Sequence, residues 1–506
     1  MTTTMTTTGN TVGTRGAPSR GSLGGAGGGN PARRGWILAV LGVAQLMVIL
    51  DATIVNIALP SAQHDLGFSN DQRQWVVTAY ALAFGSLLLL GGRIGDLFGR
   101  KRTLLVGLAG FAAASAVGGA ATGFDMLVVA RAAQGMFGAL LAPAVLSLLT
   151  TTFTEPRERA RAFGIYGVIG ITGGAGGLLL GGVLTEYLDW RWCLFVNLIF
   201  AVVALIGGAT LLEHTPAEER PKLDLPGTIA VSAGLFSLVY GFANAETHSW
   251  SATGTWGFLL AGVVLLAAFV VLQTRVAHPL LPMRVLLDRN RAGAYLTVFM
   301  AGIGMFGIFL FLTYYLQQNL GFSPIISGAA FLPMIGAVMI TGTSGTTVLL
   351  PRFGPRRLIS LGMFTAAGGM FWLTNLTVHS TYATDVLPAL VIIGLGLGLS
   401  MAPSMATATG GVEPRDAGVA SATVNTAQQV GGSIGTALLS TIAATATTHY
   451  LTGKTPTPDT LAHAAIHSYT TAFTWAAAIF AAGAIICGLL IRPGSPDSTA
   501  PSTIHL

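Results

Sequence analysis

The chain has 506 residues, of which 52% are hydrophobic and only 9% are charged. An ordinary soluble domain carries about 25% charged residues, so this composition excludes a soluble enzyme or binding module. The apolar runs are continuous and about twenty residues long, which fits membrane-spanning helices and excludes the alternating strands of a membrane barrel. The net charge of +6 follows the loops between the runs and does not indicate a nucleic-acid partner. The sequence therefore predicts an all-α polytopic membrane protein.

The chain divides into two polar tails and a series of apolar spans. Residues 1–34 are rich in Thr, Gly and Ser and are expected to form a disordered cytoplasmic tail, with a second tail at residues 493–506. Because the number of spans is even, both termini lie on one side of the membrane. Fourteen spans are predicted, at residues 36–59, 75–95, 102–122, 124–151, 162–185, 190–212, 225–245, 254–276, 292–317, 323–347, 356–378, 385–409, 417–445 and 468–491.

The basic residues indicate which side this is. The chain has 26 Lys and Arg residues, and cytoplasmic loops of membrane proteins carry an excess of them. With cytoplasmic termini, the basic residues outside the cytoplasm are Arg131, inside a span, and Arg73, Arg191 and Lys454, on the outer face. The sequence predicts a multi-pass protein of the cell inner (cytoplasmic) membrane with both termini in the cytoplasm.

A basic segment occurs twice in the chain. Residues 98–107 read Phe-Gly-Arg-Lys-Arg-Thr-Leu-Leu-Val-Gly, and residues 353–362 read Phe-Gly-Pro-Arg-Arg-Leu-Ile-Ser-Leu-Gly. Each segment follows a long span and opens the next one at the cytoplasmic face. The repeat predicts two six-helix bundles with a transport site at their interface, as in many secondary transporters. The bundles are expected at residues 35–212 and 292–492, and two extra helices with linkers at 213–291.

Asp51 and Arg131 are the charged residues predicted to lie deep in the membrane. A carboxylate there costs about 3 kcal/mol unless it is paired, hydrated or protonated, so such residues usually mark ion or proton pathways. At 1.5 Å per residue, both lie roughly 10–12 Å below the outer surface, which favours pairing. Thr53, Asn56 and Gln134 could extend a polar network there. The alternatives are a purely structural ion pair, or an arginine held by backbone carbonyls.

Gly92, Asp96, Gly99, Arg100 and Lys101 form a glycine-rich basic turn between the second and third spans. Glycines permit close backbone approach, and Asp96 can cap a helix or pair with Arg100. The spacing predicts a cytoplasmic gate. The alternative is that these charges only set the topology.

The fifth span carries Gly173, Gly177 and Gly181 at a spacing of four, followed by Gly182. This spacing puts small residues on one helix face, where another helix can pack closely, and the glycine density also permits bending. Static helix packing is the alternative interpretation.

The second half of the chain offers uncharged polar residues rather than buried acids. Candidate cavity-lining residues are Tyr314, Gln317 and Gln318 in the ninth span and Asn425, Gln428 and Gln429 in the thirteenth, with interhelical hydrogen bonding as the alternative. Glu413 and Asp416 lie at a cytoplasmic edge. The two cysteines, Cys193 and Cys487, fall in apolar spans and predict neither a disulfide nor a metal site. Because no nucleotide-binding loop is present, the expected energy source is a gradient.

Several ordered motifs resemble the major facilitator superfamily, and within it the fourteen-helix drug:proton antiporters of the EmrB/QacA type. Residues 92–104 resemble the superfamily's cytoplasmic-loop signature, residues 127–135 its fourth-helix signature with the arginine, and residues 50–60 the first-helix signature of the fourteen-helix branch. Residues 173–182 resemble the fifth-helix antiporter signature, except that Leu178 stands where the family usually has proline.

The resemblance implies the major facilitator fold and alternating access between two bundles. It implies proton-coupled export of hydrophobic or amphipathic drugs without a cofactor, no enzymatic activity, a small-molecule substrate, and a monomer. Asp51 would bind the proton, Arg131 would tune it, and Asp96 with Arg100 would lock the cytoplasmic side. A proton-coupled nutrient importer on the same fold is the main alternative, and a non-transporting membrane sensor is a third.

Overall fold

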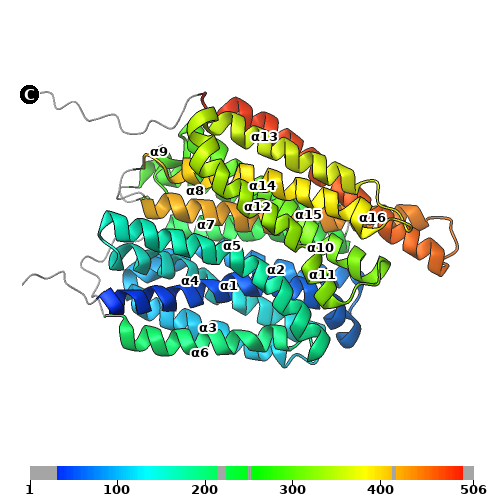
Figure 1. The fold of residues 1–506 in the computed structure, drawn as a ribbon, viewed down its shortest axis with the longest axis horizontal. Helices are drawn as coiled ribbons and strands as arrows, with labels where there is room; N and C mark the ends of the chain where they lie inside the picture. The colour runs from blue at the N-terminus through cyan, green and yellow to red at the C-terminus, as the bar shows by residue number, and fades with distance from the viewer. Residues whose placement is uncertain are drawn as a thin grey trace, which may run out of the picture.

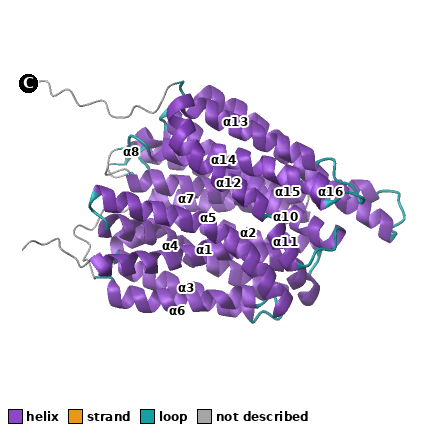
Figure 2. Cartoon of the chain, viewed as in Figure 1, coloured by secondary structure: helices purple, strands orange, loops and turns teal. Residues whose placement is uncertain are grey.

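The computed structural model describes residues 31–213, 224–248, 250, 252–276, 279–412 and 417–493. The predicted tails lie almost entirely outside these residues, as do Glu413 and Asp416. Within the described part of the chain, all regular structure is helical (Figure 2). Long apolar sequences form helices here because a helix satisfies its backbone hydrogen bonds internally, as the bilayer requires.

The helices follow the predicted spans and extend beyond several of them. The first six are α1 (Pro31–Leu66), α2 (Asn70–Phe98), α3 (Arg100–Gly119), α4 (Phe124–Thr152), α5 (Pro156–Tyr187) and α6 (Trp192–Leu211). The middle of the chain forms α7 (Leu225–His248), α8 (Thr253–Arg275) and the short α9 (Met283–Leu286). The last part forms α10 (Arg289–Tyr314), η1 (Tyr315–Asn319), α11 (Pro324–Ala330), α12 (Leu332–Ser344), η2 (Gly345–Leu349), α13 (Leu350–Leu373), η3 (Tyr382–Val386), α14 (Leu387–Thr409), α15 (Ala417–Leu451) and α16 (Pro458–Leu490), where η denotes a π-helical turn.

Among the described residues, 12 stretches are long and apolar enough to cross a membrane. One of them, Pro324–Leu373, contains two predicted spans that meet at a kink at Gly354. Helix α5 is not among the 12, yet it packs along α1 as a full-length member of its bundle. With these two additions, the structure has the two six-helix bundles and two extra helices expected from the sequence.

The two bundles lie side by side, with α1–α6 in the lower part of Figure 1 and α10–α16 in the upper part. Helix α7 packs against both α2 and α15, so the extra pair sits beside the line where the bundles meet. Helix α8 packs mainly on α7, and only 22% of the residues in its most apolar stretch are buried. We call the end of the molecule that holds the start of α1 and the end of α16 the terminal end (Figure 1).

The repeated basic segments fold alike in the two halves. Gly99 separates α2 from α3 with a φ of 92°, and Gly354 kinks α13 with a φ of 71°. Residues that carry a side chain rarely adopt a positive φ, so glycine is favoured at both turns. The internal repeat therefore has a conformational basis.

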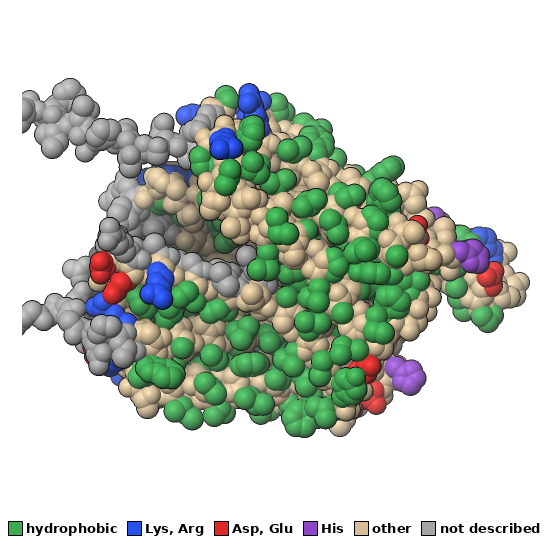
Figure 3. All heavy atoms as spheres, in the orientation of Figure 1, with side chains coloured by type: hydrophobic (Ala, Val, Ile, Leu, Met, Phe, Trp, Pro, Cys, Tyr) green, Lys and Arg blue, Asp and Glu red, His purple; other side chains and the backbone are tan. Residues whose placement is uncertain are grey.

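Charged side chains gather at the two ends of the molecule, and apolar side chains cover the face between them (Figure 3). At the terminal end, Arg33 pairs with Glu213 at 2.6 Å and Arg34 with Glu158 at 2.8 Å. Exposed apolar residues along the helices form the belt that a bilayer would cover.

Candidate functional site

The centre of the N-terminal bundle holds a fully buried ion pair. Arg131 on α4 donates from an Nη to Asp51 Oδ2 on α1 at 2.6 Å, and the two residues are 1% and 0% exposed. An arginine guanidinium carries its positive charge in proteins, so this buried charge needs a partner. Removing one partner of such a pair usually costs about 3–5 kcal/mol, because the other charge is left buried and uncompensated.

Three amide and hydroxyl side chains complete the site. Gln134 Nε2 donates to Asp51 Oδ1 at 2.9 Å, and Asn197 Nδ2 donates to the same oxygen at 2.7 Å. Gln134 Oε1 also accepts from Arg131 at 2.8 Å, and Gln134 Nε2 lies 2.7 Å from Ser115 Oγ. Both carboxylate oxygens are thus hydrogen-bonded, which is how a buried charge is stabilised.

Helix α2 positions the arginine from the other side. Arg131 Nε donates to the backbone carbonyl of Val76 at 3.2 Å, and its guanidinium lies 4.4 Å from the centre of the Tyr80 ring. The site is therefore built by α1, α2, α3, α4 and α6 of one bundle, with no described contribution from the other. We call Asp51, Arg131, Gln134, Asn197 and Ser115 the buried polar cluster.

Two predicted neighbours of Asp51 are buried but bond to their own helix. Thr53 Oγ1 donates to the carbonyls of Ile49 and Leu50, and Asn56 Nδ2 donates to that of Ala52 at 3.1 Å. Asn56 Oδ1 is buried and has no partner among the described residues. Their role in a substrate cavity stays a prediction.

The glycines of α5 pack directly on the stretch of α1 that carries Asp51. A Cβ at Gly177 would collide with Thr53 Oγ1 and come within 3.0 Å of the Leu50 carbonyl oxygen. A Cβ at Gly173 would lie 3.0 Å from Leu46, and one at Gly181 would lie 2.9 Å from the Ile54 carbonyl oxygen. The spacing of four thus brings α5 against the α1 residues that flank Asp51.

Gly182 faces the other bundle instead. A Cβ there would lie 2.5 Å from the Ile325 Cα, and one at Gly328 of α11 would collide with the Leu178 carbonyl of α5. Two glycines therefore allow α5 and α11 to touch backbone to backbone. This contact is part of the closure between the bundles at the end opposite the termini.

Helix α1 contributes to the same closure. Tyr314 Oη donates to Gln63 Oε1 at 2.7 Å, and Gln317 Nε2 donates to the Ile57 carbonyl at 3.2 Å. The Arg73 guanidinium lies 3.9 Å from the centre of the Tyr314 ring. The structure thus places Tyr314 and Gln317 in a closed contact between α1, α2, α10 and η1.

The predicted gate lies at the terminal end. Gly99 forms the turn described above, a Cβ at Gly92 would lie 3.6 Å from Pro143, and Arg100 is half-buried. Lys101 Nζ donates to the carbonyls of Ala209 at 2.8 Å and Leu212 at 2.6 Å, which holds α3 to the end of α6. The Asp96 side chain lies outside the described residues, so its pairing stays a prediction.

Asn425, Gln428 and Gln429 are half-buried on α15. The same stretch of α15 lines an open cleft of about 310 Å³ between α7, α10 and α15, whose walls include Phe299 and Thr426. The molecule is also hollowed at the terminal end between the two bundles (Figure 3). None of the three amides lines the open cleft, so their role in a substrate cavity stays a prediction.

Asn197 and Ser115 are members of the cluster that the sequence reasoning missed. Asn197 is a single amide within the highly apolar α6, and that isolation is a signal that could have identified it. Ser115 has no such signal among the small residues of α3. A third missed residue, the buried Asp224, lies away from the cluster, where it caps α7 through the Gly227 amide at 2.9 Å and accepts from Gln273.

Solved structures with this fold are transporters. A bacterial homolog of the human lysosomal transporter Spinster, inward-facing and unoccupied, covers 92% of this chain and 98% of its own with a TM-score of 0.65 and 16% identity. A peptide transporter of the POT family has a TM-score of 0.67 and 17% identity, covering 93% and 99%. At such identities, the likeness shows the fold alone.

Sequence relatives are much closer. The puromycin resistance protein pur8 of Streptomyces alboniger is 48% identical over 476 residues, which cover 93% of this chain and 94% of that protein. The cephamycin export protein CmcT of Amycolatopsis lactamdurans is 37% identical, covering 92% and 93%. The multidrug efflux pump LfrA of Mycolicibacterium smegmatis is 32% identical, covering 81% of each chain. Residues 41–436 match the Major Facilitator Superfamily, and the chain belongs to this superfamily of membrane transporters.

Proposed function

We propose that this protein exports hydrophobic or amphipathic small molecules, antibiotics among them, in exchange for protons. The observation that carries the proposal is the buried Asp51–Arg131 pair in a transporter whose relatives are named for antibiotic resistance and export. Asp51 is the proton-binding group, since Arg131 does not lose its proton in a protein. The energy source is the proton gradient, and no cofactor takes part.

The hydrogen bonds of Asp51 suit a group that changes its protonation state. Asn197 and Gln134 donate to the ionised carboxylate, and an amide can turn its oxygen toward a protonated one. Asn197 Oδ1 is buried and has no partner among the described residues, so an acceptor is already present within the cluster. The two amides can therefore hold Asp51 in either state.

Protonation must also move helices. A neutral Asp51 no longer balances the charge of Arg131, and an unbalanced buried charge costs about 3–5 kcal/mol. That cost is relieved when α1 shifts against α4 and admits water. The glycine face of α5 provides a smooth surface for this shift, because Gly173, Gly177 and Gly181 present no side chain to α1.

Helix α1 connects the proton site to the closed end. Ile57 and Gln63 of α1 contact the other bundle, and they follow Asp51 by about 9 Å and 18 Å along the helix at 1.5 Å per residue. A shift of α1 on protonation therefore loosens the closed contact. Proton entry is thereby coupled to the opening of the bundles to the outside, and bound substrate drives the same opening during exchange of substrate for substrate.

The transporter works as a monomer in the cell membrane with the terminal end in the cytoplasm. In this orientation, the hollow between the bundles opens to the cytoplasm, where a substrate for export enters (Figure 3). The basic side chains of the terminal end support the same orientation. Apolar walls with a few polar groups suit amphipathic substrates.

Membrane vesicles of known orientation test the function. Puromycin is the first compound to try, because the 48% identical relative is named for puromycin resistance. We expect an acid interior to drive puromycin accumulation in inside-out vesicles and the gene to protect a pump-deficient host. Accumulation in right-side-out vesicles, driven by an acid exterior, would identify an importer instead. Failure of a broad panel of antibiotics and dyes in both orientations would contradict proton-coupled transport.

A further inference from the structure

We propose that protons reach Asp51 from the outside through the interior of the N-terminal bundle, past a plug formed by Trp190, and not through the space between the bundles. The inference rests on the proposed function and adds a separate entrance for the proton. Water in this entrance carries the proton, and the proton binds to a carboxylate oxygen of Asp51.

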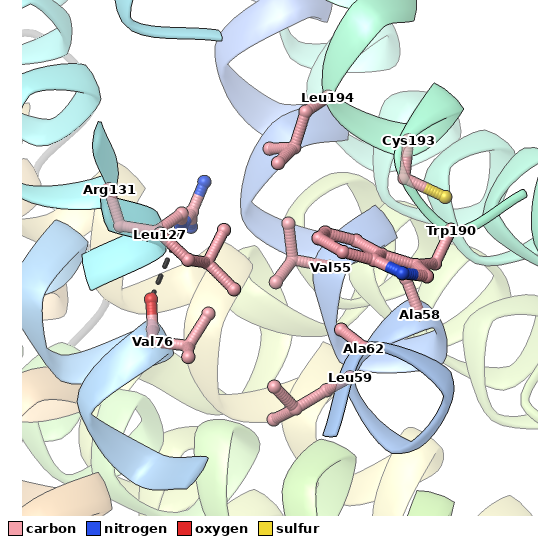
Figure 4. Close-up of a pocket in the computed structure, with 10 residues that line it drawn as sticks. All are labelled: Val55, Ala58, Leu59, Ala62, Val76, Leu127, Arg131, Trp190, Cys193 and Leu194. Atoms are coloured by element: carbon pink, nitrogen blue, oxygen red, sulfur yellow. Dashed lines mark hydrogen bonds between the residues drawn. The ribbon is translucent and has the colours of Figure 1, made fainter. Parts of the chain in front are cut away.

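A small cavity lies between the Asp51–Arg131 pair and the outer end of the bundle. It offers about 10 Å³ to the centres of water molecules, which is room for about one water. Arg131 lines one side of the cavity and Trp190 the opposite side, with Leu127 and Val55 between them (Figure 4). The arginine that holds Asp51 therefore faces a space inside its own bundle.

Trp190 separates this cavity from the outer surface. The side chain is 5% exposed, and its Nε1 donates to Asp65 Oδ2 at 3.1 Å. Asp65 is about half exposed and pairs with Arg191 at 2.7 Å, and the Arg191 guanidinium lies 4.6 Å from the centre of the Trp190 ring. One indole thus contacts the apolar cavity on one side and a solvent-facing ion pair on the other.

The route between the bundles is closed on the same side. The α5–α11 backbone contact and the Tyr314–Gln63 and Gln317–Ile57 hydrogen bonds seal it. The cavity behind Trp190 lies inside the bundle on this side, and its walls are apolar. Narrow apolar passages of this kind conduct only when they are transiently wetted, so the indole can act as a gate against leakage.

A separate entrance has a consequence for the transport cycle. Substrate and proton would not need to compete for one aqueous path. The substrate would enter between the bundles from the cytoplasm, and the proton would enter through the N-terminal bundle from the outside. Filling the cavity should therefore stop proton-driven export while leaving exchange of substrate for substrate intact. This split in the readout distinguishes a blocked proton path from a damaged substrate site.

Ala58 lines the cavity and is 3% exposed, whereas Ala144 on α4 is equally buried at 2% in a different apolar cluster. We expect Ala58→Leu to reduce proton-driven efflux at least tenfold with counterflow within twofold of wild type. Ala144→Leu adds the same volume elsewhere and should reduce both readouts equally or neither. Normal proton-driven efflux by a folded Ala58→Leu protein would overturn the proposal.

Chemical modification of the native Cys193 after folding tests the same passage without a substitution in the cavity wall. Cys193 lines the cavity and is 1% exposed, and the other cysteine is replaced by Cys487→Ser. A small membrane-impermeant thiosulfonate added outside should modify Cys193 slowly, because the cavity has room for about one water, and the modified protein should lose proton-driven efflux but not counterflow. Trp190→Ala should speed the modification at least tenfold, and in Cys193→Ser the reagent should change nothing. Modification that leaves efflux unchanged, or none from outside even in Trp190→Ala, would refute the entrance.

The proposed function can fail separately. If unmodified wild-type protein shows no proton-driven transport of any substrate, the antiport itself is wrong. A different outcome would contradict the entrance alone. In that outcome, wild type shows proton-driven transport, and Ala58→Leu, Trp190→Ala and the protein modified at Cys193 all show the same transport with full coupling.

Discussion

The N-terminal bundle (α1–α6) and the C-terminal bundle (α10–α16) bend at equivalent glycines, Gly99 and Gly354, but differ in the charges they bury. The first bundle encloses Asp51 and Arg131 in a network of amides. The second has no Asp, Glu, Lys or Arg between Arg291 and Arg352, and its later spans carry none at depth. The repeat thus preserved the turn and the helix plan, while ion chemistry is confined to one half.

This difference suggests a division of labour. The proposed proton exchange needs a carboxylate that is held rigidly enough to keep its partners, and five helices of the first bundle, α1 among them, build the site of Asp51. The second bundle offers hydroxyls, amides and apolar walls, which can contact varied substrates without a fixed charge. The two halves meet through α1, which carries both Asp51 and two contacts of the closed end.

The largest effect is expected from Asp51→Asn. The amide fits the same space but cannot titrate, so proton-driven efflux should fall more than a hundredfold while insertion into the membrane stays normal. Asp125→Asn is the matched control, because Asp125 is an exposed acid in the first turn of α4 in the same bundle. Efflux by the Asp51→Asn protein within a few-fold of wild type would remove Asp51 from the mechanism.

Arg131→Lys should reduce efflux by tenfold or more. The arginine reaches Asp51, Gln134 and the Val76 carbonyl together, and a lysine ammonium has no planar fork to hold such a set. Proton-driven efflux per folded protein is the measurement. A fully active lysine variant would show that only the positive charge matters.

Gly177→Ala should reduce efflux several-fold and destabilise the protein by about 1–3 kcal/mol, the usual range for overpacking. The new methyl would collide with Thr53 beside Asp51. Gly174→Ala is the control on the same helix, since a Cβ there would meet nothing within 4 Å. Thermal unfolding and efflux of the two variants are compared, and equal behaviour would contradict a role for the α1–α5 contact.

The sequence predicted the fold well because its strongest signals are local. Apolar run length defined the helices, and the two Phe-Gly basic segments revealed the repeat. The pairing of Asp51 and Arg131 followed from similar depths and was confirmed by the 2.6 Å contact. Asn197 was missed because its approach to Asp51 depends on how α6 rotates in the bundle, which no spacing within one helix specifies.

The candidate cavity residues show a second limit. Tyr314 lies in a closed contact with Gln63, because the conformation of the bundles decides whether a polar side chain faces a cavity or a neighbour. A single sequence describes all states of a transporter at once. It therefore cannot assign such a residue to one state.

Tyr314→Phe should have a modest effect of a few-fold. It removes the hydrogen bond to Gln63, worth about 1 kcal/mol, while keeping the ring beneath Arg73. The closed outer contact should weaken, so cysteine pairs placed across α1 and α10 should cross-link more slowly than in wild type. Unchanged cross-linking would show that the Gln317–Ile57 hydrogen bond and the α5–α11 glycine contact set the closure without Tyr314.

The smallest effect is expected from a change of membrane potential, which tests whether the second bundle lacks a proton-binding group. Asp51 is the carboxylate at membrane depth, and the second bundle supplies none, so one proton should move per cycle. A monovalent cation leaving as one proton enters moves no net charge, whereas a neutral substrate exchanged for one proton moves one charge inward. The membrane potential contributes about 2.3 kcal/mol per charge per 100 mV. With the potential set by valinomycin and potassium at fixed pH gradient, cation export should therefore not change, and neutral export should. Strong potential dependence for a monovalent cation would require a second proton-binding group, for which Glu413 and Asp416 are the first acids to neutralise.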